Sequence, residues 1–176
     1  LTSLLDGQLR IVRTRSVILA TGGLGRLHLN GFPTSNHLGA TGDGLVLAYR
    51  IGARLCELDS FQYPPTGLLH PSHLAGKLVT EGVRAAGALL VNGLGRRFID
   101  ELQPRDVVCA AILRECSEGR GVRVDDQHSG VWLDTPRLER TQPGILEQQF
   151  TSLMTRTHVA GIDPRREPLL VHPTLH

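Results

Sequence analysis

Two glycine-rich turns carry residue types that could hold a nucleotide. Glycines 22, 23 and 25 follow the apolar run Val17-Ile-Leu-Ala20, and a second turn, Thr41-Gly-Asp-Gly44, opens a helix-like run. Because glycine lacks a Cβ, such a backbone can approach a ligand where any other side chain would collide. Asp43 stands where its carboxylate could cap a helix or meet a ligand hydroxyl. The two turns together are typical of a nucleotide site.

The elements around these turns predict one α/β layer. Val17 to Leu19 are apolar without alternation, which predicts a strand buried on both faces. Residues 8–13 alternate polar and apolar side chains, as a half-exposed strand does. Residues 42–53 have apolar positions at helical spacing, with Gly52 as the expected stop.

The consecutive prolines Pro64 and Pro65 can continue neither a helix nor a central strand, so we place a domain boundary before them. The chain then divides into residues 1–62 and 63–176. In the second region we expect mixed helices and strands: one or two helices over 73–86, a hairpin of 88–92 with 97–99, a helix over 105–118, a short strand over 131–133 and a helix over 144–159.

The helix over 105–118 is the clearest of these elements. Pro104 precedes its first turn and Gly119 follows its end. Its expected buried face comprises Val107, Val108, Ala111, Ile112 and Cys116. Arg105 therefore lies at a helix N-terminus, where pairing with Asp106 or Glu101 would be an ordinary structural role.

Composition limits the classes of function. The chain has 176 residues, a net charge of +2 and dispersed arginines, so a nucleic-acid partner is disfavoured. No run reaches the roughly 20 apolar residues of a membrane helix, so direct membrane insertion is not expected. Cys56, Cys109 and Cys116 lack C-x-x-C spacing, which favours reduced, packed thiols in a cytoplasmic protein. Neither they nor the histidines show ligand spacing, and no metal site is expected.

Eight motifs occur in one order along the chain, and together they resemble a known family. They are Ala20-Thr-Gly-Gly23, Thr34-Ser-Asn36, Ala40-Thr-Gly-Asp-Gly44, Phe61-Gln-Tyr-Pro-Pro-Thr-Gly67, Leu78-Val-Thr-Glu-Gly-Val-Arg84, Gly95-Arg-Arg-Phe98, Arg105-Asp-Val-Val108 and Pro173-Thr-Leu-His176. This series is similar to the flavoprotein subunits of succinate dehydrogenase and fumarate reductase and to the related L-aspartate oxidases.

The resemblance implies a fold, a cofactor and a cellular setting. The fold would be part of a Rossmann-like FAD-binding domain followed by a mixed α+β capping domain. The family's G-x-G-x-x-G turn does not precede residue 17, so we expect an internal fragment of a longer protein. FAD is the implied cofactor, and an iron–sulfur subunit the implied electron-transfer partner. The implied location is cytoplasmic, at the membrane face through partner subunits.

The resemblance also implies roles for individual residues. Arg105 matches the acid or base of the proton step that accompanies hydride transfer, with Glu81 in its polar relay. Thr80 and His176 match groups that bind a carboxylate of a small dicarboxylate such as succinate or fumarate. Ala20, Thr21, Gly22 and Gly23 match the turn along the flavin nucleotide, and Asp43 matches an FAD-contacting aspartate.

One departure stands out, because Pro64 occupies the position of a substrate-binding histidine in the resembled family. Two alternatives follow: the substrate differs, or the protein is impaired. An apparent four-residue addition before Thr80 resembles the aspartate oxidase branch. The sequence therefore leaves three readings: a succinate- or fumarate-type enzyme, an L-aspartate oxidase, or a truncated non-catalytic remnant.

Overall fold

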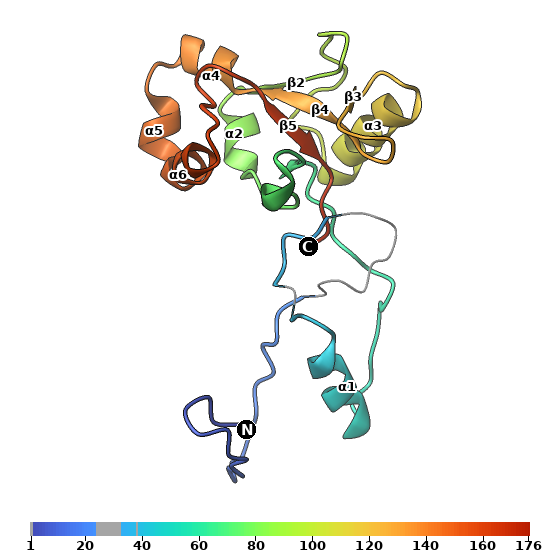
Figure 1. Cartoon of the computed structure of the whole chain (residues 1–176). Helices are drawn as coiled ribbons and strands as arrows, with labels where there is room; N and C mark the ends of the chain where they lie inside the picture. The colour runs from blue at the N-terminus through green and yellow to red at the C-terminus, as the bar shows by residue number, and fades with distance from the viewer. Residues whose placement is uncertain (1, 24–32, 38) are drawn as a thin grey trace.

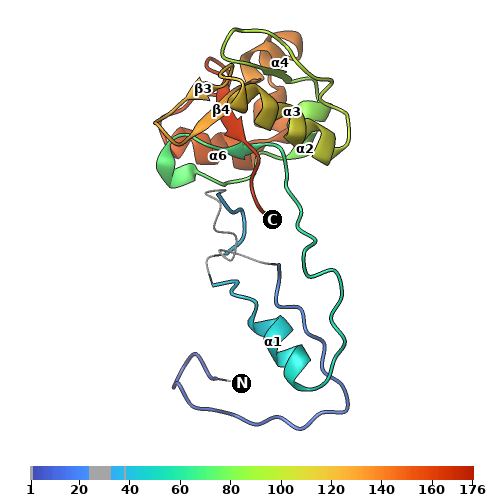
Figure 2. The ribbon, with the colours of Figure 1, turned by 90° about the vertical axis from the view of Figure 1, so that its right-hand side faces the viewer.

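The structure is a computed structural model that describes residues 2–23, 33–37 and 39–176. A compact body of mixed helices and antiparallel sheet forms one end of the molecule (Figure 1). The N-terminal segment and helix α1 (Asp43–Arg50) extend away from it, and the C-terminus lies where the two parts meet (Figures 1 and 2). This arrangement places His176 beside both parts.

The body is organised around an antiparallel sheet with the strand order β1-β5-β4-β2, and β3 pairs with β4 beside this path. The strands are β1 (Gly67–Leu68), β2 (Leu89–Val91), β3 (Val122–Arg123), β4 (Ser129–Asp134) and β5 (Leu169–His172). In β4, Val131 and Leu133 are fully buried while Trp132 between them is half-buried, as alternation along a strand requires. The predicted strand over 131–133 is confirmed and is longer than expected.

Six further helical segments surround this sheet. α3 packs against β4 on one side, and α4, α5 and α6 lie together at the other side of the body in Figure 1. Their bounds are η1 (Ser72–Leu74), α2 (Glu81–Ala85), α3 (Arg105–Ser117), α4 (Thr135–Thr141), α5 (Ile145–Gln149) and α6 (Thr151–Val159). The α3 helix begins at Arg105 as predicted, with Pro104 at its N-cap.

The predicted buried face of α3 is confirmed at Val108 and Ile112, with Ala111 and Cys116 half-buried, but is wrong at Val107. Val108 and Ile112 are fully buried and Glu115 is buried with them, whereas Val107 is 41% exposed. Each residue turns the helix by 100°, so the row 108, 112 and 115 faces the sheet and Val107 falls outside it. Glu115 tolerates burial because Arg120 and the Asn92 amide donate hydrogen bonds to it.

The prediction of one or two helices over 73–86 is confirmed in its two-helix form, because the segment contains η1 and α2, separated at Gly76, whose φ is +84°. The single helix predicted over 144–159 is wrong, because Phe150 adopts φ −123° and ψ 40° between α5 and α6. The Phe150 ring packs against the apolar core. The packing of the Phe150 side chain therefore divides a segment whose sequence pattern predicts one continuous helix.

The predicted hairpin of 88–92 with 97–99 forms, but its strand pairing is shorter than expected. The Asn92 amide donates to the Arg96 carbonyl and the Gly95 amide donates back to the Asn92 carbonyl, closing the turn. Beyond the turn only a single bridge, Val91 to Arg97, continues the pairing.

The two strands predicted near the N-terminus are absent from the described residues. Val17 is 74% and Ile18 is 92% exposed, so the prediction of a strand buried on both faces is wrong for this chain. Residues 8–13 are likewise irregular, with one bridge between Thr2 and Leu9. A strand requires a neighbour for its backbone groups, and no described segment pairs with 17–20. By contrast, the predicted helix α1 forms and ends before Gly52, whose φ is +85°.

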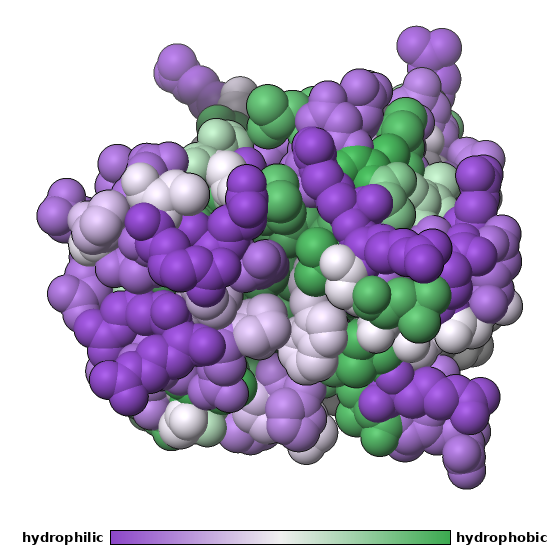
Figure 3. Space-filling view, turned by 90° about the horizontal axis from the view of Figure 1, so that it is seen from above, coloured by the Kyte–Doolittle hydropathy of each residue, from purple (hydrophilic) through white to green (hydrophobic). Residues whose placement is uncertain are grey.

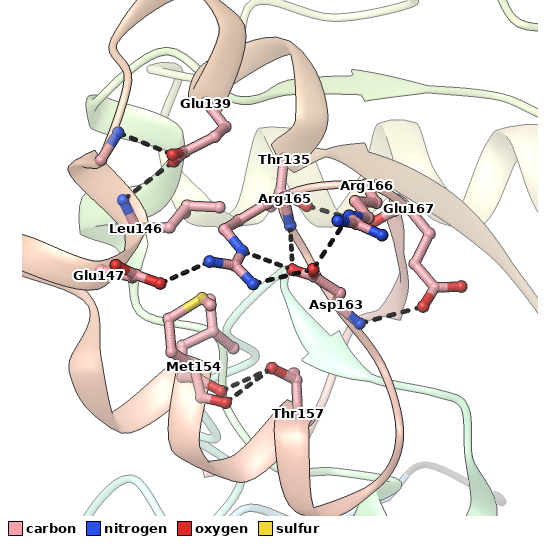
Figure 4. A network of polar contacts seen from close by, with 12 residues as sticks. Thr135, Glu139, Leu146, Glu147, Met154, Thr157, Asp163, Arg165, Arg166 and Glu167 are labelled. Carbon is pink, nitrogen blue, oxygen red and sulfur yellow. Dashed lines mark hydrogen bonds and ion pairs between the residues drawn. The ribbon is translucent and has the colours of Figure 1, made fainter.

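A polar network holds the segment between α6 and β5 (Figure 4). The Asp163 carboxylate accepts hydrogen bonds from the Arg165 guanidinium, which also pairs with Glu147 of α5. These bonds hold the pKa of Asp163 at about 2, below the usual range of a carboxyl group.

Polar side chains dominate the upper face of the body, where apolar residues form a broken band (Figure 3).

Candidate active site and cofactor groove

The two glycine turns lie together in the structure and line one groove. The groove has a volume of about 580 Å³, and Thr21, Gly22, Gly23 and Asp43 line it together with His176. Four of the five predicted cofactor residues therefore meet in space, while Ala20 is exposed and does not line the groove.

Gly44 allows the start of α1 to approach the first turn. A Cβ at this position would lie 2.0 Å from the Thr21 hydroxyl oxygen and 2.9 Å from its Cβ. No side chain fits there without moving one of the two turns. The close approach of the two turns thus requires glycine at position 44.

Asp43 is the first residue of α1 and not its cap, so the N-cap interpretation is wrong. Gly42 occupies the N-cap position with φ 82° and makes no side-chain capping bond. The Asp43 carboxylate instead accepts a hydrogen bond of 2.9 Å from the Thr41 hydroxyl. It remains exposed and lines the groove, where it can accept a hydrogen bond from a ligand hydroxyl.

Backbone hydrogen bonds fix His176 between the body and the N-terminal part. The His176 amide donates to the Gln62 carbonyl at 3.0 Å, and the Leu175 amide donates to the Pro33 carbonyl at 2.8 Å. The His176 Nδ1 atom lies 2.9 Å from the Ser35 hydroxyl oxygen. His176 also lines a second, smaller pocket of about 210 Å³. It is therefore shared by the groove and the pocket.

The smaller pocket contains the predicted catalytic pair. Arg105 Nε and Nη2 lie 2.9 Å and 2.8 Å from the same oxygen, Oε2 of Glu81. Both side chains are about half exposed, at 45% and 48%. The pairing joins the first turns of α2 and α3. It replaces the predicted structural pairing of Arg105 with Asp106 or Glu101.

Arg84 is a member of this pocket that the sequence analysis did not assign. It is 2% exposed, and its guanidinium donates to the Glu101 carbonyl while Nη2 lies 3.6 Å from Oε1 of Glu81. Its Nε atom is buried and has no partner among the described residues. Burial lowers the pKa of this guanidinium. Its position three residues after Glu81, on the same face of α2, was the available signal.

Thr80 lies next to this cluster but lines neither cavity. Its hydroxyl accepts a hydrogen bond of 3.4 Å from the Gly82 amide, so Thr80 is the N-cap of α2. The hydroxyl proton remains available as a donor. In the described structure Thr80 thus orients the helix that carries Glu81.

The three cysteines occupy different environments. Cys56 is exposed, Cys116 is half-buried and Cys109 is buried, and all three are free thiols. The Cys109 thiol donates to the Tyr63 carbonyl at 2.9 Å, and burial raises its pKa to about 12. Cys109 is therefore a packed, protonated thiol one turn after Arg105.

The described residues contain neither a metal cluster nor a membrane-spanning helix. No three His, Cys, Asp or Glu side chains within 2–23, 33–37 and 39–176 gather as metal ligands. Among the helices of the described part, none is sufficiently long and apolar to cross a membrane.

A glycine-lined groove beside a pocket of paired charges is typical of enzymes that use a nucleotide cofactor. The chain belongs to the FAD binding domain family, whose model matches residues 5–176. FAD is thus its cofactor, and the close approach at Gly44 and the Asp43 carboxylate in the groove lining fit a nucleotide.

Curated relatives and solved structures agree with this assignment. The chain is 36% identical over 181 residues to a fumarate reductase (CoM/CoB) subunit of Methanothermobacter marburgensis, covering 99% of the chain and 31% of that protein. It is 38% identical over 179 residues to a succinate dehydrogenase flavoprotein subunit of Rickettsia conorii, covering 97% and 28%. A solved quinol fumarate reductase FrdA variant from E. coli matches with TM-score 0.70 and 32% identity, over 89% of this chain and 28% of that one. The chain thus spans about a third of the length of these relatives.

Proposed function

We propose that the chain forms the substrate side and part of the FAD site of an oxidoreductase of the succinate dehydrogenase and fumarate reductase type. The enzyme would interconvert a small saturated carboxylic acid and its unsaturated counterpart, as succinate and fumarate interconvert. The observation that carries this proposal is His176, which lines both the glycine groove and the pocket that contains Arg105 and Glu81. Cofactor and substrate would meet at that residue.

FAD, when bound, would supply the acceptor or donor of the hydride. Asp43 would accept a hydrogen bond from a cofactor hydroxyl, and Ala20 to Gly23 would follow its nucleotide part. Gly44 would keep this surface free of side chains where α1 meets Thr21.

Arg105 would transfer the proton that accompanies the hydride. A free guanidinium stays protonated and is a poor base, so the role requires assistance. Glu81 touches Arg105 at 2.8 Å and approaches Arg84 at 3.6 Å, which makes a continuous polar chain from the pocket to a buried guanidinium. Transfer along this chain becomes easier once the site closes and excludes water. His176 would hold a substrate carboxylate as a hydrogen-bond donor, and Thr80, which lines neither cavity in this structure, would donate to it only once the site closes.

The domain assignment is part of this proposal. Residues 1–62 would belong to a Rossmann-like FAD-binding domain, and residues 63–176 would form an α+β capping domain that closes over the flavin. The apolar residues of the main core support it, because they begin at Leu68 and lie in the second region. An iron–sulfur subunit would take or supply electrons, and the protein would act in the cytoplasm at the membrane face through partner subunits.

Stopped-flow spectroscopy of the gene product that contains this chain tests the proposal. Its bound flavin is reduced anaerobically and mixed with fumarate or another small unsaturated acid. We expect reoxidation of the flavin, and a Glu81→Gln variant should slow it. A reduced flavin that no unsaturated acid reoxidises would support the non-catalytic alternative instead. L-Aspartate as a reductant of the oxidised flavin tests the aspartate oxidase alternative in the same apparatus.

A further inference from the structure

Two sets of residues line the pocket around Arg105, which has a volume of about 210 Å³. The polar set comprises Glu81, Arg84, Arg105 and His176. The apolar set comprises two pairs, Pro64 with Pro65 and Leu78 with Val79. A proline has neither a backbone N–H nor a side-chain donor, so residues 64 and 65 offer a ligand no hydrogen-bond donor.

Four polar backbone groups of the apolar set are engaged within the protein. The Pro64 carbonyl accepts from the Thr174 amide at 3.0 Å, and the Leu78 carbonyl accepts from Arg156 at 3.0 Å. Val79 donates its amide to the Thr66 carbonyl at 2.8 Å and accepts from the Thr66 hydroxyl at 2.9 Å. Gln62 adds a neutral amide to the lining. The apolar set therefore offers no charged group to a second carboxylate, and burying a carboxylate without a charged partner is costly.

The charge of the polar set fits one carboxylate. Arg84 and Arg105 are cations, and Glu81 neutralises one of them through its contacts with both. One positive charge remains, with His176 as an additional hydrogen-bond donor or acceptor. The volume also lies below the range of pockets for drug-sized ligands, which indicates a small acid.

We infer, building on the proposed function, that the pocket selects an unsaturated acid with a single carboxylate and an uncharged group on its other end. Pro64 is then a specificity-determining residue. In the reductive direction FAD, when bound, would supply the hydride for the carbon β to the carboxylate, and Arg105 would give the α carbon its proton. The carbon–carbon π bond would break, the acid would gain two electrons, and the flavin would lose them.

The test compares two saturated four-carbon acids, butanoate and succinate. They differ at one end, where butanoate has a methyl group and succinate has a second carboxylate. Their dissociation constants for the FAD-loaded gene product are measured by calorimetry, a readout independent of turnover. We expect butanoate to bind more tightly than succinate. Pro64→His places a donor within the apolar set and should shift the ratio of the two constants at least ~10-fold toward succinate, the lower range for one charge-assisted hydrogen bond. Pro64→Ala removes the ring without adding a side-chain donor and should leave the ratio within about threefold of wild type.

A second variant keeps the inference testable if Pro64→His does not fold. Leu78 also lines the pocket and is 38% exposed, so Leu78→His adds a donor to the apolar set at an accessible position and should shift the ratio in the same direction. Tighter binding of succinate than of butanoate by the wild type would overturn the inference while leaving the proposed function intact. So would a ratio that neither histidine variant changes. Absence of binding by either acid, together with a reduced flavin that neither fumarate nor but-2-enoate reoxidises, would remove the proposed function itself.

Discussion

Replacing Glu101 should destabilise the body through one buried backbone amide. The Glu101 residue is 4% exposed, and its Oε1 accepts a hydrogen bond of 2.8 Å from the Leu90 amide of β2. Its carboxylate also pairs with Arg97 at 2.7 Å, but the Arg97 side chain is 51% exposed and can be hydrated if the pair is lost. Glu101 therefore joins an edge strand to the segment before α3.

The two interactions set the expected magnitude. Glu101→Ala leaves the buried Leu90 amide without its acceptor, which costs about 1–3 kcal/mol. Loss of the half-exposed ion pair adds about 0–1 kcal/mol. We expect a total near 2–3 kcal/mol for Glu101→Ala, and about 1 kcal/mol for Glu101→Gln, which keeps an acceptor for the amide.

Urea unfolding followed by tryptophan fluorescence measures both values. Trp132 is the single tryptophan of the chain and pairs with Val91 of β2, so it reports on this part of the sheet. Asp100→Asn is the matched control, because Asp100 lies 3.9 Å from Arg97 and is exposed; it should change the free energy of unfolding by less than about 0.5 kcal/mol. A Glu101→Ala variant as stable as wild type, or a control that loses as much, would refute this reasoning.

Three further outcomes follow from the structure. The raised pKa of Cys109, about 12, keeps its thiol protonated at pH 8, so iodoacetamide should label exposed Cys56 first, as read by peptide mass spectrometry; equal rates would contradict the buried position. The pKa of Asp163 is held at about 2, so its ionised form stabilises the fold above the ordinary carboxyl pKa and this stabilisation is lost as the pH falls toward 2. The deficit of Asp163→Asn in urea unfolding should therefore shrink between pH 5 and pH 2, and a constant deficit would count against the network. Gly44→Ala should weaken FAD binding by the gene product at least ~10-fold because of the 2.0 Å approach to Thr21; adding Thr21→Gly should recover part of the affinity, and an unaffected single variant would disprove the close contact.

The sequence predicted elements whose signals are local. Pro104 and Gly119 delimit α3, Gly52 follows the end of α1, and Val131 with Leu133 marks the central strand, because each depends on a backbone preference or a short period. The break at Phe150 depends on core packing, which no local pattern records. The prediction of a strand at 17–20 was wrong for a related reason, since a strand forms only beside a neighbouring strand that can be distant in sequence.

The candidate site shows the same division. The five cofactor residues, Ala20 to Gly23 and Asp43, could be predicted because they belong to recognisable motifs. The structure brings all of them except Ala20 into one groove. Arg84 was missed because a buried arginine in a short helix looks like an ordinary surface residue in sequence. Its role became visible only through its burial and its approach to Glu81.

The rate of the chemical step in an Arg105→Lys variant tests the central claim most directly. Lysine keeps the charge but loses the planar fork that now makes both contacts to Glu81, at 2.9 Å and 2.8 Å. Arg114→Lys on the same helix is the control, because Arg114 lies on the exposed side of α3. In stopped-flow reoxidation of the reduced flavin, the account predicts a rate at least ~10²-fold lower for Arg105→Lys and an unchanged rate for Arg114→Lys. An Arg105→Lys variant that keeps more than about half of the wild-type rate would contradict proton transfer by Arg105 and leave it a structural partner of Glu81.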